Sequence, residues 1–120
     1  MEFTIPESCG NSPRMQIVAE IARAWGEGDQ AHLEQWLLPD AEWHVHPTEP
    51  EAEFQRLVLD NVVTHGRLGS CDGVAVGADG SAVRFAHFMV FASTAKTAKI
   101  RSITTYVVSA GKDFDGAGND

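Results

Sequence analysis

Residues 81–92 read Ser-Ala-Val-Arg-Phe-Ala-His-Phe-Met-Val-Phe-Ala, and this stretch decides the fold. Its period of two predicts one long β-strand. The residues on one face of this strand are Val83, Phe85, His87, Met89 and Phe91. The other face is also apolar, apart from Arg84. A strand that is apolar on both sides needs a partner layer on each side, and the helices encoded earlier in the chain supply only one of them.

The second apolar face needs a covering of its own, because no further helix is left in a chain of 120 residues. We predict that a second copy of the protein covers it, which gives a homodimer packed sheet to sheet. The alternative is an exposed apolar patch that Arg84 and Arg101 make more soluble.

The first half of the chain predicts three helices. They cover residues 13–26, a shorter segment that starts at Asp29 and ends before Pro39, and residues 49–65. Ser12 followed by Pro13 is a good N-cap followed by a good first helical residue. The third segment shows a stripe at helical spacing, formed by Phe54, Leu57, Val58, Asn61, Val62 and His65.

The remaining segments predict an antiparallel sheet. A short strand covers residues 41–46, and longer strands cover residues 68–76, 81–92 and 99–109. Gly69 and Gly73 indicate a bulge or sharp bend in the second of these. The expected architecture is one α+β domain at residues 13–109, with helices packed in a curved, mostly antiparallel sheet. A flexible arm at 1–12 and a disordered tail at 110–120 flank it.

Charge excludes several partner classes. Residues 1–60 carry twelve acids and three bases, whereas residues 61–120 carry five acids and six bases. No basic patch is expected, so neither nucleic acid nor an anionic membrane surface is a predicted partner. Cys9 and Cys71 form no metal-binding motif, and the chain shows neither a signal peptide nor an apolar run of membrane-spanning length. A cytoplasmic location is the expectation.

Two short motifs carry a resemblance to a known superfamily. Residues 24–29 read Ala-Trp-Gly-Glu-Gly-Asp, and residues 38–45 read Leu-Pro-Asp-Ala-Glu-Trp-His-Val. With the order of elements, they resemble the nuclear transport factor 2-like (NTF2-like) superfamily, in particular its SnoaL-like (polyketide cyclase-like) branch. The resemblance covers roughly residues 14–109. It implies a cystatin/NTF2-like cone with a deep pocket at its wide end, commonly dimeric through the sheet.

The superfamily includes steroid isomerases, polyketide cyclases, dehydratases and epoxide hydrolases, beside members that only bind or assemble. Fold alone therefore does not assign an activity. The carboxylate that several of these enzymes use has no matching position here, and Asp72 is only a conceivable substitute. This departure speaks against a steroid-isomerase-like reaction.

His87 is the leading candidate for chemistry, because it interrupts an apolar face. Burial keeps a histidine neutral and able to accept a proton. The alternative is a structural histidine bonded within the core. On the predicted third helix, Asn61 and His65 interrupt the apolar stripe and are expected to line the same cavity, with His65 as a second catalytic candidate; otherwise His65 interacts with the end of its helix.

Other residues are candidates for contacting a ligand. Tyr106 offers a phenol that could polarise a carbonyl group, and Trp43 could stack on a ligand. Phe85 and Met89 flank His87 on its apolar face. His44 and His46 form an H-x-H pair, but no third ligand follows at a suitable spacing, so no metal is predicted.

Two functions remain open at this point. The first is a pocket for a hydrophobic carbonyl compound in which His87 acts as a base, catalysing isomerisation, cyclisation or dehydration without a cofactor. The second is a non-catalytic homodimer that binds a ligand or a protein.

Overall fold

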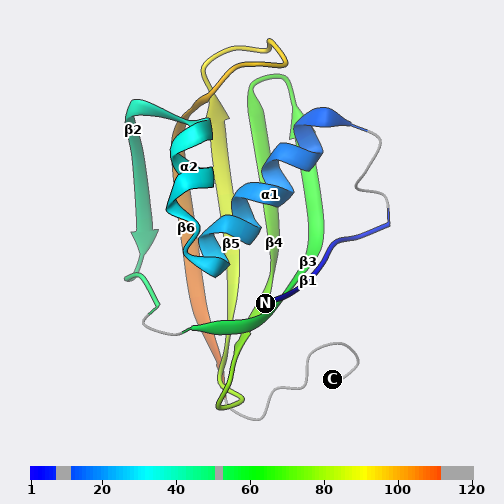
Figure 1. Cartoon of the computed structure of the whole chain (residues 1–120), viewed down its shortest axis with the longest axis vertical. Coiled ribbons are helices and arrows are strands. Elements are labelled where there is room, and N and C mark those ends of the chain that lie inside the picture. The colour runs from blue at the N-terminus through cyan, green and yellow to red at the C-terminus, as the bar shows by residue number, and fades with distance from the viewer. Residues whose placement is uncertain (8–11, 51–52, 112–120) are drawn as a thin grey trace.

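The structure is a computed structural model that describes residues 1–7, 12–50 and 53–111. Six strands form one sheet in the order β1-β3-β4-β5-β6-β2, accompanied by two helices (Figure 1). The elements are β1 Glu2–Thr4, α1 Pro13–Glu27, α2 Gln30–Trp36, β2 Leu37–His46, β3 Phe54–His65, β4 Leu68–Gly77, β5 Ala82–Phe91 and β6 Ile100–Gly111. Strands β3 to β6 pair antiparallel, whereas β1 joins β3 and β2 joins β6 in parallel.

The molecule has two layers. Both helices lie across the same face of the sheet, with α1 over β3 and β4 and α2 beside β2 (Figure 1). The alternation predicted for β5 is confirmed, because its inward residues Phe85, His87, Met89 and Phe91 are all buried. Most of the core consists of aliphatic and aromatic side chains between these layers. Within the described ranges, neither helix is long and apolar enough to span a membrane.

The prediction of a third helix at residues 49–65 is wrong, since residues 54–65 form strand β3. A β-bulge explains the misleading pattern. Strand β3 pairs Leu59 with Gly73 and Asn61 with Asp72, which leaves Asp60 as an extra residue. The inserted residue breaks the period of two, so inward side chains recur at mixed spacings that imitate a helical stripe.

Gly73 lets the two backbones approach at this bulge. A Cβ atom at Gly73 would overlap the carbonyl oxygen of Val58 on the neighbouring strand. The sequence predicts the bulge or bend within the strand that contains Gly69 and Gly73, whereas the structure places the extra residue on β3, opposite Gly73.

The ends of α1 follow the predicted capping. Ser12 Oγ accepts a hydrogen bond from Met15 N, and Gly28 at φ 71° ends the helix in the left-handed conformation. The segment predicted as a flexible arm contains strand β1, which extends the sheet beside β3. At the other end, β6 continues to Gly111, and residues 112–120 of the predicted tail lie outside the described residues.

Candidate functional site

His87 lies at the centre of an aromatic cluster beneath the helices. Its side chain is 0% exposed and projects from the inward face of β5. The ring centroid lies 4.7 Å from that of Trp25 on α1 and 5.1 Å from that of Phe85 on the same strand. Trp43 on β2 lies 6.1 Å away in an edge-on arrangement. Three separate elements therefore enclose the imidazole.

A chain of hydrogen bonds fixes the orientation of His87. Trp43 Nε1 donates to Thr105 Oγ1 at 2.9 Å, and Thr105 Oγ1 lies 2.7 Å from His87 Nδ1. Because an indole N–H only donates, the Thr105 hydroxyl accepts from Trp43, and it can then either donate its own proton to His87 Nδ1 or accept a second hydrogen bond from it. A neutral imidazole that accepts at Nδ1 carries its proton at Nε2. The Nε2–H tautomer is thus the one in which the Thr105 hydroxyl donates to Nδ1.

The Nε2 atom of His87 has no hydrogen-bond partner among the described residues, although it is buried. Burial also lowers the pKa of His87 from its ordinary value of 6.5 to about 3. The imidazole is thus neutral throughout the physiological range and is a weak proton acceptor. In the Nε2–H tautomer it offers one hydrogen bond from Nε2.

Two hollows open beside this cluster. One has a volume of about 300 Å³ and is lined by residues that include Leu33 and Trp43. The other, of about 670 Å³, is lined by residues that include Phe54. Trp25, Gly28 and Glu49 line both hollows, so the two share a wall. Trp25 is also the indole nearest His87, and His87 itself is not among the described residues that line either hollow.

Carboxylates surround the opening. Trp25 Nε1 donates to Glu49 Oε1 at 3.0 Å in an exposed hydrogen bond. Glu27, Glu49 and Glu53 line the larger hollow together, and no Lys or Arg joins them among its described lining residues. The entrance is therefore acidic, while Trp25 and Phe54 make its floor aromatic.

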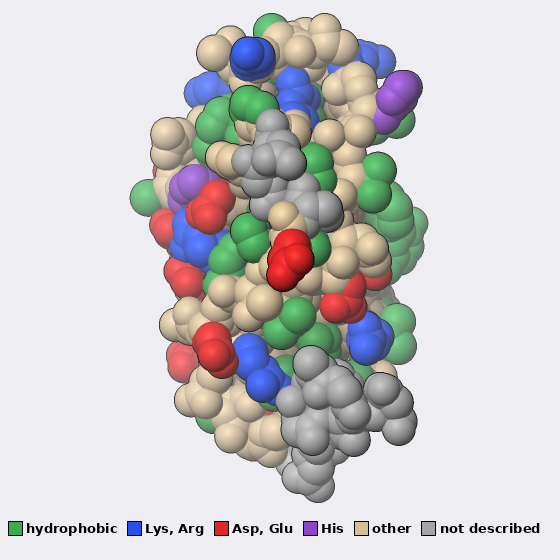
Figure 2. All heavy atoms as spheres, turned by 90° about the vertical axis from the view of Figure 1, so that its right-hand side faces the viewer, with side chains coloured by type: hydrophobic (Ala, Val, Ile, Leu, Met, Phe, Trp, Pro, Cys, Tyr) green, Lys and Arg blue, Asp and Glu red, His purple; other side chains and the backbone are tan. Residues whose placement is uncertain are grey.

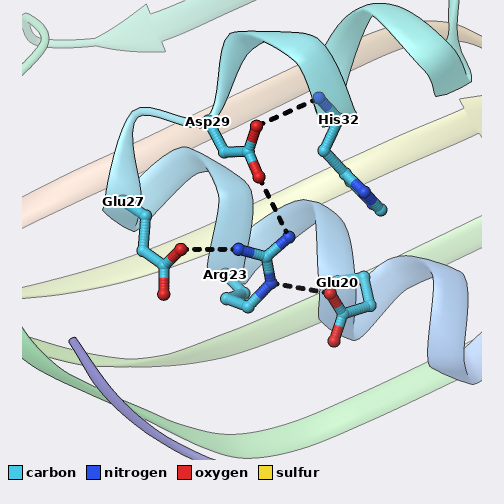
Figure 3. A network of polar contacts seen from close by, with 5 residues as sticks. All are labelled: Glu20, Arg23, Glu27, Asp29 and His32. Atoms are coloured by element: carbon cyan, nitrogen blue, oxygen red, sulfur yellow. Dashed lines mark hydrogen bonds and ion pairs between the residues drawn. The ribbon is translucent and has the colours of Figure 1, made fainter.

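A network around Arg23 holds the helical wall of the site in place (Figure 3). Arg23 Nε and Nη1 lie 2.6 Å from Glu20 Oε1 and Glu27 Oε1, and Nη2 reaches Asp29 Oδ2 at 3.4 Å. The hydrogen bond to Glu20 is the largest of the effects that raise the pKa of Arg23. Asp29 also caps α2 by accepting from His32 N. The network thereby joins the end of α1 to the start of α2, where Gly28 lines both hollows.

The structure brings together only some of the residues that the sequence indicated. Trp43, Phe85 and His87 meet, and Met89 is buried further along the same face of β5. The predicted convergence of Asn61, His65 and Tyr106 on His87 is wrong. Asn61 and His65 are exposed on β3, and Asn61 Nδ2 instead donates to Asp72 Oδ1 at 2.9 Å.

Tyr106 lies on the face of the sheet opposite His87. It is 50% exposed, stacks on His46 at 5.4 Å between ring centroids and meets Phe88 edge-on at 6.0 Å. His44 lies beside Glu42 at 3.5 Å near the surface. Across the part of the chain that the structure describes, no three His, Cys, Asp or Glu side chains gather as metal ligands would.

Sequence reasoning missed Thr105, Trp25 and Glu49 as site residues. For Thr105 a signal existed, because it stands between Ile103 and Val107 on an apolar face of the last strand. For Trp25 the sequence indicated only a core aromatic residue. Glu49 lies in the segment for which the sequence predicts a third helix, and because that helix does not form, the sequence does not indicate the position of Glu49 at the entrance.

Comparisons with known proteins identify the fold. No protein-family model matches the chain, and no curated protein matches it. Among solved structures, an NTF-2 like protein of unknown function from Burkholderia xenovorans LB400 is similar, with 15% sequence identity and a TM-score of 0.55 over 89% of this chain and 92% of that one. A cystatin-like fold protein from the same organism is 15% identical with a TM-score of 0.46 over 82% of this chain and 95% of that one. The similarity to the first of these structures shows that this protein has an NTF2-like fold.

Proposed function

We propose that this protein binds a small, largely apolar molecule in the hollows beside Trp25 and Trp43. In this proposal His87 Nε2–H donates a hydrogen bond to a carbonyl or hydroxyl oxygen of the ligand. The observation that carries the proposal is the buried Nε2 atom without a described partner. A buried donor left unsatisfied costs about 1–3 kcal/mol, and a ligand oxygen would recover that cost.

The shape and charge of the site restrict the ligand further. The hollows of about 300 and 670 Å³ have the size of small-molecule pockets. Their aromatic walls favour flat or apolar ligands, such as polyketide-, terpenoid- or steroid-like carbonyl compounds. Glu49 and Glu53 at the entrance repel anions, whereas Arg23 balances the charge of Glu27, so a neutral or cationic ligand is favoured over a carboxylate.

Entry to His87 requires an indole to move, because Nε2 is buried. Trp25 is suited to this movement, since its Nε1 is held by a single exposed hydrogen bond to Glu49. An exposed hydrogen bond of this kind adds little net stability. We therefore propose that the ligand displaces the Trp25 indole and takes its place against the imidazole.

Proton-transfer catalysis is the finer version of this proposal, and the resemblance to the SnoaL-like branch supports it. The low pKa of His87 makes it a better donor to a substrate carbonyl than a base. Glu49 is the carboxylate that lines both hollows and could serve as the base. The reaction would be an isomerisation, cyclisation or dehydration of a carbonyl compound without a cofactor.

Binding is tested by titrating neutral polycyclic ketones into the protein while following its tryptophan fluorescence, to which Trp25 and Trp43 contribute together with Trp36. We expect saturable quenching, and we expect His87→Gln to weaken binding roughly 3- to 10-fold, the value of one hydrogen bond. His65→Gln is the matched control, because His65 is exposed on β3. Equal affinities of the two variants would remove His87 from the site.

A second proposal concerns the other face of the sheet, which we propose binds a second copy of this chain. Exposed apolar side chains gather there: Val63, Leu68, Phe88, Tyr106 and Val108 are between 50% and 66% exposed. In Figure 2 hydrophobic side chains follow the right-hand edge, where this face is seen in profile. Arg84 donates a hydrogen bond to Asp60 at 3.3 Å on this face. The face therefore carries one positive and one negative side chain, and an identical copy would offer a partner of opposite charge to each of them.

Phe88→Glu is expected to prevent this association, because it would bury a carboxylate at the centre of the contact. Light scattering after size exclusion should then give twice the chain mass for the wild type and the chain mass for the variant. Ile5→Glu is the matched control, since Ile5 is also an exposed apolar residue but lies outside this patch. A wild type that remains monomeric at high concentration would refute the dimer.

A further inference from the structure

A third hollow lies at the opposite end of α1 from the proposed ligand site. It has a volume of about 330 Å³, and the side chains that matter here are Arg14, Lys96, His65, Thr64 and Thr94. They come from the first turn of α1, the end of β3 and the loop between β5 and β6. In Figure 2 Lys and Arg side chains gather at the upper end of the molecule, which is where α1 begins in Figure 1.

Arg14 is held in a fixed position within this hollow. Its guanidinium carbon lies 3.9 Å from the centroid of the Phe91 ring, and Nη2 donates to the carbonyl oxygen of Ala95 at 2.8 Å. The Nη1 atom is buried and has no hydrogen-bond partner among the described residues. Burial lowers the pKa of Arg14, with no carboxylate among the causes of the shift. A cation is therefore present that no carboxylate among the described residues neutralises.

The charge around this hollow contrasts with that of the whole chain. The protein has a formal net charge of −8, yet no carboxylate is among the described residues that line this hollow. Its lining instead combines Arg14 and Lys96 with His65 and two threonines. Such a set of cationic and hydroxyl donors is typical of oxyanion recognition.

The start of α1 contributes less to this hollow than the side chains do. Ser12 Oγ accepts from Met15 N at 3.4 Å, and the Ser12 carbonyl oxygen accepts from Gln16 N at 3.1 Å. These backbone donors are therefore already used within the helix. Any anion must be held mainly by Arg14 and Lys96, with the helix dipole adding a weaker attraction.

We propose that this hollow binds the phosphate group of a phosphorylated small molecule. The Arg14 guanidinium would donate to the phosphate oxygens, Lys96 would neutralise the remaining charge, and the hydroxyls of Thr64 and Thr94 would complete the contacts. The hollow is larger than a phosphate group alone, which leaves room for an organic part. This site is independent of the proposed function, because the ligand hollows lie at the other end of α1.

Phosphorus NMR and thermal unfolding of the full chain test the site with inorganic phosphate as the probe, at constant ionic strength with chloride as the balancing ion. We expect saturable binding in the millimolar range and a phosphate-dependent rise in the unfolding temperature. Lys96→Gln should weaken binding about 5- to 10-fold. Lys99→Gln is the matched control, since Lys99 is exposed, carries the same charge and does not line the hollow.

Arg14→Gln should abolish binding. If Arg14→Gln unfolds because it loses the contact of Arg14 with Phe91, the weaker binding of Lys96→Gln still tests the site. Acetate serves as a second probe, to distinguish phosphate from carboxylate recognition. Phosphate binding that Lys96→Gln weakens and Lys99→Gln retains supports the proposal. The absence of binding, equal weakening by both lysine variants, or acetate binding as strong as phosphate binding would overturn it.

Discussion

Thr105→Val is expected to lower the free energy of unfolding by about 2–4 kcal/mol, because valine keeps the shape of threonine but removes its hydroxyl group. Trp43 Nε1 and His87 Nδ1 would both lose the partner that they share at 2.9 and 2.7 Å. Leaving a buried polar group unsatisfied costs about 1–3 kcal/mol. Urea unfolding followed by tryptophan fluorescence measures the loss.

Thr104→Val is the control for this prediction. It makes the same chemical change one residue earlier, on the face of β6 that turns away from the helices. We expect a change within about 0.5 kcal/mol there, as for most surface substitutions. If the two variants lost the same stability, the Thr105 hydroxyl would not be the link between Trp43 and His87.

The second prediction concerns pH. His87 has a pKa of about 3 in the folded protein, against 6.5 for an ordinary histidine. Below pH 6.5 the unfolded chain therefore takes up a proton at this residue, whereas the folded chain does not. The contribution of neutral His87 to the free energy of unfolding is complete above pH 6.5 and declines as the pH falls towards 3. At pH 5 the free energy of unfolding is lower by about 2 kcal/mol.

His87→Gln isolates this contribution, because glutamine does not titrate. The difference in free energy of unfolding between wild type and variant should change by about 2 kcal/mol between pH 7.5 and pH 5. The carboxylates of the acidic half titrate in both proteins, so their effect cancels in the difference. Parallel pH profiles of the two proteins would mean that His87 is protonated as readily in the folded state as in the unfolded one.

The sequence predicted the central strand and its buried histidine because β5 is regular. From Phe85 to Phe91 each inward position of β5 is apolar apart from His87, and buried and less buried positions alternate over this part of the strand. The period of two in the sequence therefore matches the buried positions in the structure, and His87 could be recognised from the sequence as the one polar residue among them. The partner of His87 was not visible, because Thr105 lies on a different strand and pairing registers are not encoded by alternation alone.

Strand β3 shows why the rest could not be predicted. Leu57, Leu59 and Val62 are the buried side chains of β3, and the extra residue Asp60 lengthens the interval between Leu59 and Val62. The resulting spacing of buried residues fits a helix as well as a bulged strand. That error placed Asn61 and His65 on an inward stripe. Strand β3 exposes both side chains instead. The predicted third helix therefore does not form one wall of the cavity beside His87.

Tyr106 illustrates a second kind of ambiguity. It alternates with Thr105, so one of the two had to face the helices. The apolar neighbours Ile103 and Val107 share the face of Thr105, and Ile103 is 0% exposed. They indicate that this face is the inward one. Comparing how apolar the two faces of β6 are indicates that Thr105, and not Tyr106, faces the helices, whereas the chemistry of the tyrosine side chain does not.

The central claim is that His87 is a neutral donor, protonated at Nε2 and held through Nδ1 by Thr105. Long-range proton–nitrogen correlation NMR of the imidazole in the wild-type protein tests it directly, since it reports which ring nitrogen carries the proton at each pH. We predict protonation at Nε2 alone, unchanged from pH 7.5 down to pH 5. A proton at Nδ1, or titration of the ring near pH 6.5, would contradict the account.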